Sequence, residues 1–204
     1  MKRAVLVLGM LVALAGCGAQ AVWAPEDEVR RWAYVHDAPP SITLLTVISN
    51  STGGGAHAAL LINGSQRVLF DPAGTWRHPQ LPERDDVHFG IQPRVMPYYI
   101  DYHSRITYHL VEQELQVSPE LAEAALREVM AYGAVAKAHC TVSVSRVLRN
   151  LGFDVVPQTY FPKQAMEAFA QVPGVIERKH YDDDPHFNGT IEVPGLIPPG
   201  DVSG

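Results

Sequence analysis

The alternation of hydrophobic and polar residues predicts several strands in the first half of the chain. Ile42 to Ile48 is rich in β-branched residues and leucine and precedes a glycine-rich loop, which is typical of a buried strand. His57 to Ile62 and Arg67 to Asp71 flank Asn63-Gly64-Ser65, a strong signal for a β-hairpin. Ile106 to Val111 alternates as a further strand does. These patterns predict a sheet in which at least two strands are antiparallel neighbours.

Helical periodicity dominates the second half. Ser118, followed by a proline at the first helical position, starts a helix that ends before Gly133. The periods of Cys140 to Leu151 and of Pro162 to Ala170 predict two more helices, and Glu26 to Tyr34 predicts a brief one near the start. Strands and helices in separate segments indicate the α+β class.

The first residues have the pattern of a secretory signal. Lys2 and Arg3 precede an apolar run from Val5 to Leu14, which is too short to span a bilayer as a mature helix. Leu14-Ala15-Gly16-Cys17 resembles the lipobox of bacterial lipoproteins, which implies cleavage after residue 16 and acylation of Cys17. An ordinary signal peptide with an incidental cysteine is the alternative. Either way, residues 1–16 are expected to lie outside the folded domain.

The charge balance limits the partners of the mature chain. Without the signal, 14 basic and 22 acidic side chains remain, an excess of acid that argues against nucleic acid. Contact with a membrane is therefore expected through lipid on Cys17. We expect residues 17–40 to be a tether and lead-in, residues 41–181 one domain, and residues 182–204 an extended tail rich in proline and glycine.

Cys140 is the candidate nucleophile. It is the only cysteine besides Cys17, and it opens a predicted helix in a protein expected in an oxidising envelope compartment. A helix N-terminus stabilises a thiolate, because unpaired N–H groups and the helix dipole favour negative charge there. A small buried core residue is the alternative interpretation of the same cysteine.

His57 and Asp71 are the candidate base and orienting residue. A three-residue hairpin loop, Asn63-Gly64-Ser65, places His57 directly opposite Asp71, where cross-strand Cβ atoms lie about 4.5 to 5.5 Å apart. A two-residue turn at Asn63-Gly64 instead places Phe70 opposite His57 and sends Asp71 to the other face. The alternatives are a strand histidine satisfied by hydrogen bonds, and a turn aspartate before Pro72.

The order of these residues resembles a known superfamily. His57-Ala58-Ala59-Leu60-Leu61-Ile62, Val68-Leu69-Phe70-Asp71 and His139-Cys140-Thr141-Val142-Ser143 resemble the NlpC-type papain-like cysteine hydrolases. The likeness is to the circularly permuted branch that includes the lecithin retinol acyltransferase-like proteins. It covers roughly residues 42 to 152. The aspartate stands where that branch more often has histidine, asparagine or glutamine, and the segment before the cysteine is unusually long.

The resemblance implies a papain-like α+β fold, with an antiparallel sheet packed against the helix that carries Cys140. It implies a thiol hydrolase or acyltransferase in which Cys140 attacks a carbonyl, His57 moves the proton, Asp71 orients His57, and no cofactor takes part. The implied substrate is a cell-wall peptide amide or a lipid ester. The location is implied by the lipobox instead: the cell envelope and, since Gly18 and not aspartate follows Cys17, the periplasmic side of the outer membrane if the bacterium has two membranes. A non-catalytic envelope lipoprotein that uses the fold for binding or scaffolding is the rival.

The remaining histidines raise the question of a metal. Four histidines and three aspartates supply zinc ligand types, but they have no HExxH motif or helical i, i+4 spacing, so no metal is expected. These residues are His78, His88, His103, His109, Asp85, Asp86 and Asp101. His139 is expected to be a surface neighbour of Cys140, and no GxSxG motif surrounds Ser143 or Ser145. The stretch from Pro72 to Pro97 is expected to form a long loop over a site.

Overall fold

The structure is a computed structural model that describes residues 18–182 and 196–199. The predictions for residues 1–17, the lipobox cysteine included, fall outside these residues, as do those for most of the proline- and glycine-rich tail. Among the described helices, none is long and apolar enough to cross a membrane.

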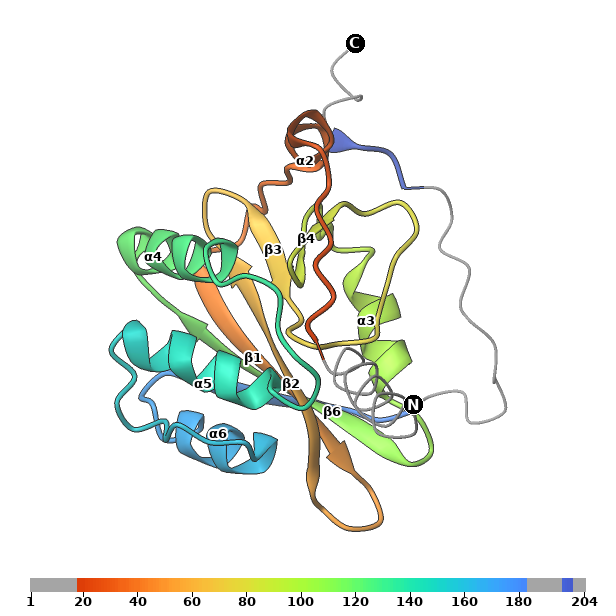
Figure 1. Ribbon diagram of the computed structural model, residues 1–204. Coiled ribbons are helices and arrows are strands. Elements are labelled where there is room, and N and C mark those ends of the chain that lie inside the picture. The colour runs from red at the N-terminus through yellow and green to blue at the C-terminus, as the bar shows by residue number, and fades with distance from the viewer. Residues whose placement is uncertain (1–17, 183–195, 200–204) are drawn as a thin grey trace, which may run out of the picture.

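A seven-stranded antiparallel sheet forms the centre of the molecule (Figure 1). Its order is β4-β5-β3-β2-β1-β6-β7, so the three long strands β2, β1 and β6 lie side by side. The strands are β1 (Ser41–Ser49), β2 (Gly55–Asn63), β3 (Arg67–Phe70), β4 (Glu83–Arg84), β5 (Val87–His88), β6 (Tyr108–Gln116) and β7 (Ile176–His180). The α+β class and the antiparallel sheet expected from the sequence are confirmed.

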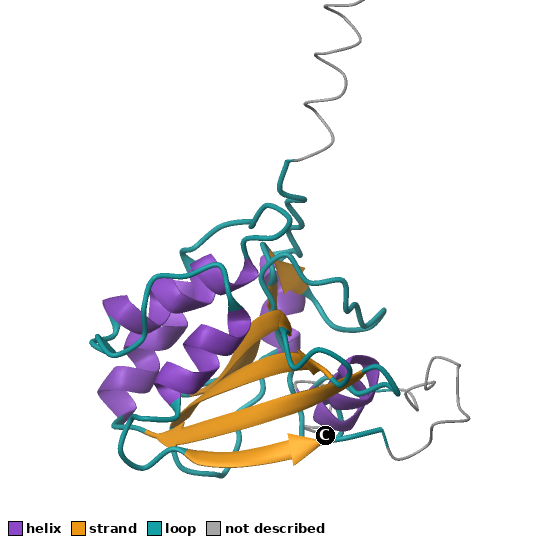
Figure 2. Ribbon diagram, turned by 90° about the horizontal axis from the view of Figure 1, so that it is seen from below, coloured by secondary structure: helices purple, strands orange, loops and turns teal. Residues whose placement is uncertain are grey.

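Helices cover both faces of this sheet (Figures 1 and 2). Three of them, α4, α5 and α6, pack on one face, and α3 lies on the other. The described helices are α2 (Glu26–Trp32), α3 (Met96–His103), α4 (Pro119–Met130), α5 (Cys140–Asn150) and α6 (Pro162–Phe169). The cysteine helix is therefore on the opposite face from α3.

Alternation along β2 divides the interior into two cores. Ala58 and Leu60 face α5 and pack with Val144 and Val147. Ala59, between them, faces the other side of the sheet and belongs to a cluster with Tyr99 of α3. Because successive strand residues point to opposite faces, His57 is on the α3 face although its own backbone adjoins the residues that contact α5.

Most of the predicted elements are present with shifted ends. The expected strand at 42–48 is β1, and α5 begins at Cys140 as its periodicity predicts. Ser118 caps α4, since its hydroxyl accepts a hydrogen bond from the Leu121 N–H at 3.3 Å. The strand expected at 106–111 begins at Tyr108 and runs five residues further, to Gln116.

Three features differ from expectation. The irregular stretch from Pro72 to Pro97 contains β4 and β5 and leads into α3, and β7 extends the sheet beyond β6. Within the tail, Leu196 is buried, and its backbone N–H donates to the Gln80 side chain at 3.0 Å. This part of the tail packs on the domain because an apolar side chain is buried and its backbone is hydrogen-bonded.

The hairpin register is neither of the two that were predicted. Ile62 pairs with Val68 and Asn63 with Arg67, so the loop is residues 64–66. Asn63 remains in β2 because its side-chain amide donates to the carbonyls of Ala38 and Pro39, both at 2.9 Å. Each residue of β2 therefore pairs with a β3 residue that lies two positions further along the chain than the predicted loop at 63–65 would give.

Candidate functional site

His57 and Asp71 are hydrogen-bonded despite the different register. The distance from His57 Nε2 to Asp71 Oδ1 is 2.6 Å. Continuing the ladder past Phe70 would set Asp71 level with Ala59, one step along the same face from His57. Because side chains alternate between faces, a shift of two residues leaves Asp71 on the same face of the sheet as His57. Nε2, the far nitrogen of the His57 ring, then reaches Asp71 across the diagonal between the two strands. The predicted contact is confirmed, and the predicted direct opposition is wrong.

Because β3 ends at Phe70, the part of β2 that carries His57 is left unpaired on its β3 side in the described part of the chain. The pairing of β2 with β3 begins at Leu60, so the β2 residues before it have no described strand partner on that side. The start of α5 lies near this gap, since a hydrogen bond from the Ala58 backbone N–H is among the effects that lower the pKa of Cys140. Because β3 is short, Cys140 at the start of α5 can approach His57, although His57 lies on the α3 face of the sheet.

Cys140 and His57 shift each other's pKa. The hydrogen bond and charge of the imidazole lower the pKa of the thiol, and Cys140 contributes to the raised pKa of His57. This mutual effect fits the sequence-based assignment of nucleophile and base. Thr141 Oγ1 lies 3.8 Å from the sulfur. Both side chains are largely covered, since Cys140 is 9% exposed and the His57 side chain 15%.

The ionisation of the three groups is coupled. Burial alone lowers the pKa of His57, but the charge and hydrogen bond of Asp71 outweigh it and, with Cys140, raise that pKa to about 10. Burial raises the pKa of Asp71, but His57 outweighs it and holds that pKa well below its usual range. Burial also raises the pKa of Cys140, yet the hydrogen bond and charge of His57 produce a net lowering. These directions favour a thiolate beside an imidazolium.

The carboxylate of Asp71 is fixed by its surroundings. It is fully buried, and the Tyr99 hydroxyl donates a second hydrogen bond to Oδ1 at 3.0 Å. Gly74 lies against it so closely that a Cβ at this position would be 1.9 Å from Oδ2. The Gly74 N–H also donates to the Asp71 carbonyl at 3.0 Å. Asp71 is therefore held by a turn that needs glycine at its fourth residue.

His103 and Tyr99 belong to the site and were not singled out as site residues by the sequence pattern. His103 is the last residue of α3, and its ring lies parallel to that of His57, at an angle of 7° and a centroid distance of 5.7 Å. Its Nδ1 is 2.9 Å from the Tyr99 carbonyl. Burial lowers the pKa of His103 to about 4, so this ring is neutral near pH 7. The i, i+4 pair Tyr99 and His103 was the available signal, in a stretch predicted to be irregular.

The other histidines lie apart from this group. His88 is buried 3.9 Å from Glu83 and against Trp76, which also contacts the ring of His78. His109 hydrogen-bonds to Asn50 and stacks on Tyr181. His139 precedes α5, where its ring contacts Tyr160. Among the described residues, only His57, Asp71 and His103 form a group of three whose potential metal-ligand atoms lie close together.

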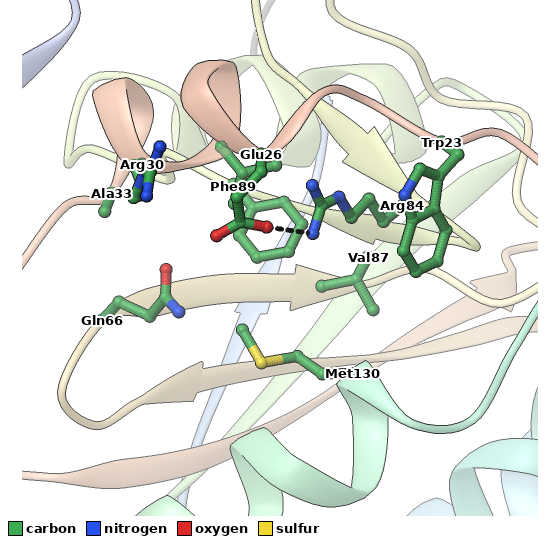
Figure 3. A pocket seen from close by; sticks show the side chains of 10 residues that line it. Trp23, Glu26, Arg30, Ala33, Gln66, Arg84, Val87, Phe89 and Met130 are labelled. Carbon is green, nitrogen blue, oxygen red and sulfur yellow. Dashed lines mark hydrogen bonds and ion pairs between the residues drawn. The ribbon is translucent and has the colours of Figure 1, made fainter.

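A depression of about 280 Å³ opens beside His57. His103, Tyr102 and Tyr108 line it, together with the turn at residues 73–75. A separate depression of about 290 Å³ lies between α2 and the β4–β5 hairpin, where Arg84 reaches both Glu26 and Trp23 (Figure 3). His57 lines the first depression and not the second, and Cys140 is not among the residues that line either one.

The arrangement has the parts of nucleophilic acyl transfer. It provides a thiol of lowered pKa, an imidazole beside it, and a buried carboxylate that fixes the ring. The N–H groups in the first turn of α5 lack intrahelical acceptors and are available to a developing oxyanion. Comparisons with protein-family models, with curated proteins and with solved structures find no match to this chain.

Proposed function

We propose that this protein is a cysteine hydrolase or acyltransferase whose catalytic residues are Cys140, His57 and Asp71. The proposal is supported by the 2.6 Å bond between His57 and the buried carboxylate of Asp71, together with the lowered pKa that His57 gives Cys140. A thiol of lowered pKa beside an oriented imidazole suits nucleophilic attack.

Each residue has one role in the reaction. Cys140 Sγ attacks a carbonyl carbon, and the tetrahedral oxyanion accepts hydrogen bonds from N–H groups at the start of α5. Since Nε2 of His57 is bonded to Asp71, the proton that moves to the leaving group is the one on Nδ1. The carbonyl carbon then loses its oxygen or nitrogen substituent and stays on sulfur as a thioester. Water or an acceptor alcohol or amine releases the acyl group and regenerates the thiol.

The fold supports a likeness to the permuted papain-like branch. An antiparallel sheet carries the histidine on β2, the aspartate just after β3, and the cysteine at the start of the helix that packs on β2. The long segment between Asp71 and Cys140 adds α3, β6 and α4. The substrate class by this likeness is a cell-wall peptide amide or a lipid ester.

The proposal includes attachment to the envelope through an acylated Cys17, facing the periplasm if the bacterium has two membranes. The lipobox pattern at Leu14-Ala15-Gly16-Cys17 carries this part. Growth with labelled palmitate tests it. Label should enter the unaltered chain and the Cys140→Ala variant but not the Cys17→Ser variant.

A trapped acyl-enzyme tests the reaction. The full chain, incubated with a p-nitrophenyl acyl ester, should release nitrophenol and gain one acyl mass on the Cys140 peptide. Hydroxylamine should remove that mass, because it cleaves thioesters. Cys140→Ala should gain none, and His57→Gln should acylate much more slowly. An ester that is turned over equally by Cys140→Ala would contradict the proposal.

A second function is favoured by one observation. Cys140 is only 9% exposed, which also suits a domain that binds a ligand without attacking it. Such a binding module would leave the thiol inert to esters and alkylating reagents in the folded protein. The acylation experiment therefore separates the two functions directly.

A further inference from the structure

The strongest unexplained feature of the site is a second histidine beside the first. The candidate acyl-transfer reaction uses His57 and Asp71 and gives His103 no step. Yet ligand atoms of His57, Asp71 and His103 all lie within 4.8 Å of one another. Two imidazoles and one carboxylate are the donor set of many three-ligand zinc sites, which keep a fourth position open.

His103 is already in the form that binds a metal. A backbone carbonyl only accepts hydrogen bonds, so the 2.9 Å contact with the Tyr99 carbonyl requires the His103 proton to be on Nδ1. This leaves the lone pair on Nε2. Metal-bound histidines almost always donate their other N–H in this way, to a carbonyl or carboxylate that fixes the ring.

Tyr99 supports a second ligand as well. Its hydroxyl donates to Asp71 Oδ1 at 3.0 Å, while Oδ2 of the same buried carboxylate has no hydrogen-bond partner among the described residues. One residue of α3 thus fixes His103 through its carbonyl and Asp71 through its hydroxyl. Hydrogen-bonded outer residues of this kind orient ligands and typically contribute about ten- to a hundredfold to metal affinity.

We propose that His57, Asp71 and His103 form a binding site for zinc, in competition with the His57–Asp71 hydrogen bond. Neighbouring ligands of a tetrahedral zinc at about 2.1 Å are about 3.4 Å apart. The 2.6 Å distance between His57 Nε2 and Asp71 Oδ1 must therefore increase by about 0.8 Å. The ion replaces the proton between these two atoms. Two nitrogen donors favour zinc over magnesium or calcium, which prefer oxygen.

Zinc here would hold the thiol site inactive, a consequence that rests on the proposed function. With its Nε2 bound to the ion, neutral His57 carries its proton on Nδ1. It then has no lone pair to accept the Cys140 proton, and Asp71 no longer orients it. Cys140 is not among the three ligands, so binding itself requires no thiol.

A chain without thiols provides the sharpest test. The full chain with Cys17→Ser and Cys140→Ala contains no cysteine, so any zinc it binds is held by other ligands. After chelator treatment, calorimetric titration should give the same zinc affinity for this chain as for the unaltered one, and no binding of magnesium. His103→Gln in the thiol-free chain should weaken zinc binding at least tenfold. His109→Gln, at a histidine outside the cluster, is the matched control and should leave the affinity unchanged.

A spectroscopic measurement does not depend on how well His103→Gln folds. Nitrogen-15 spectra of the thiol-free chain should show zinc-dependent shifts at one ring nitrogen each of His57 and His103, and none at His109. Zinc affinity that vanishes with the thiols, or ring signals of His57 and His103 that do not respond to zinc, would overturn the site. Acylation of Cys140 in excess chelator tests the proposed function alone, so failure of one inference is distinguishable from failure of the other.

Discussion

Gly74→Ala should uncouple Asp71 from His57 without altering any of the three candidate catalytic residues. The added Cβ would lie 1.9 Å from Asp71 Oδ2 and 2.4 Å from its Cγ, where ordinary contacts begin near 3.4 Å. Relief of that overlap requires a relative shift of about 1.5 Å, and the same shift would stretch the 2.6 Å bond to His57 past the hydrogen-bonding limit. The carboxylate and the turn that follows it then separate.

The pKa of His57 reports the result. Asp71 makes the largest contribution to raising this pKa to about 10, so its loss should return the pKa toward the ordinary value of about 6.5. Imidazole NMR titration of the full chain measures it. Gly54→Ala is the control, because the nearest atom to its added Cβ is Thr52 Oγ1 at 3.2 Å, in the loop before β2. A His57 titration in folded Gly74→Ala identical to that of the unaltered chain would refute the reasoning.

Three further predictions concern single residues. Asp71→Asn should keep the fold and slow Cys140 acylation, because the amide cannot stabilise the His57 imidazolium; a lowered melting temperature with unchanged acylation kinetics would remove Asp71 from the site. Tyr99→Phe removes one donor to the buried carboxylate, so urea unfolding should show a loss of about 1 to 3 kcal/mol, and a neutral result would show that this hydrogen bond contributes little. Burial lowers the pKa of His88 to about 4, so its unfolded form binds a proton below about pH 6.5 while the folded form does not. Stability should therefore fall by up to about 3 kcal/mol as the pH drops from 6.5 to 4, and His88→Gln should flatten that dependence in urea titrations; equal slopes in both proteins would contradict it.

Local patterns predicted most of the elements that carry the site. The β-branched run at 42–48 and the periodicity from Cys140 identified β1 and α5 because one buried face dictates each pattern. The pairing of His57 with Asp71 also followed from their shared face. Their exact opposition did not, because Asn63 is kept in β2 by hydrogen bonds to residues 38 and 39, which are distant in sequence.

Non-local contacts determine the parts that sequence patterns missed. The stretch that leads into α3 is irregular and proline-rich, and Tyr99 becomes significant only when tertiary packing brings its hydroxyl to Asp71. His103 was considered as one of several possible zinc ligands on loops. Its place beside His57 depends on the packing of α3 on the sheet face opposite α5, which no local pattern encodes.

The central claim is that His57 and the start of α5 hold Cys140 as a reactive thiolate. The most direct measurement is the rate of iodoacetamide alkylation at Cys140 against pH, followed by mass spectrometry of the Cys140 peptide from the folded full chain. An ordinary thiol with a pKa near 8.5 is only about 0.3% ionised at pH 6. The rate at pH 6 should lie far above that of the unfolded chain, and His57→Gln should lose that excess. A folded chain whose Cys140 does not react, or reacts with the pH profile of the unfolded chain, would contradict it.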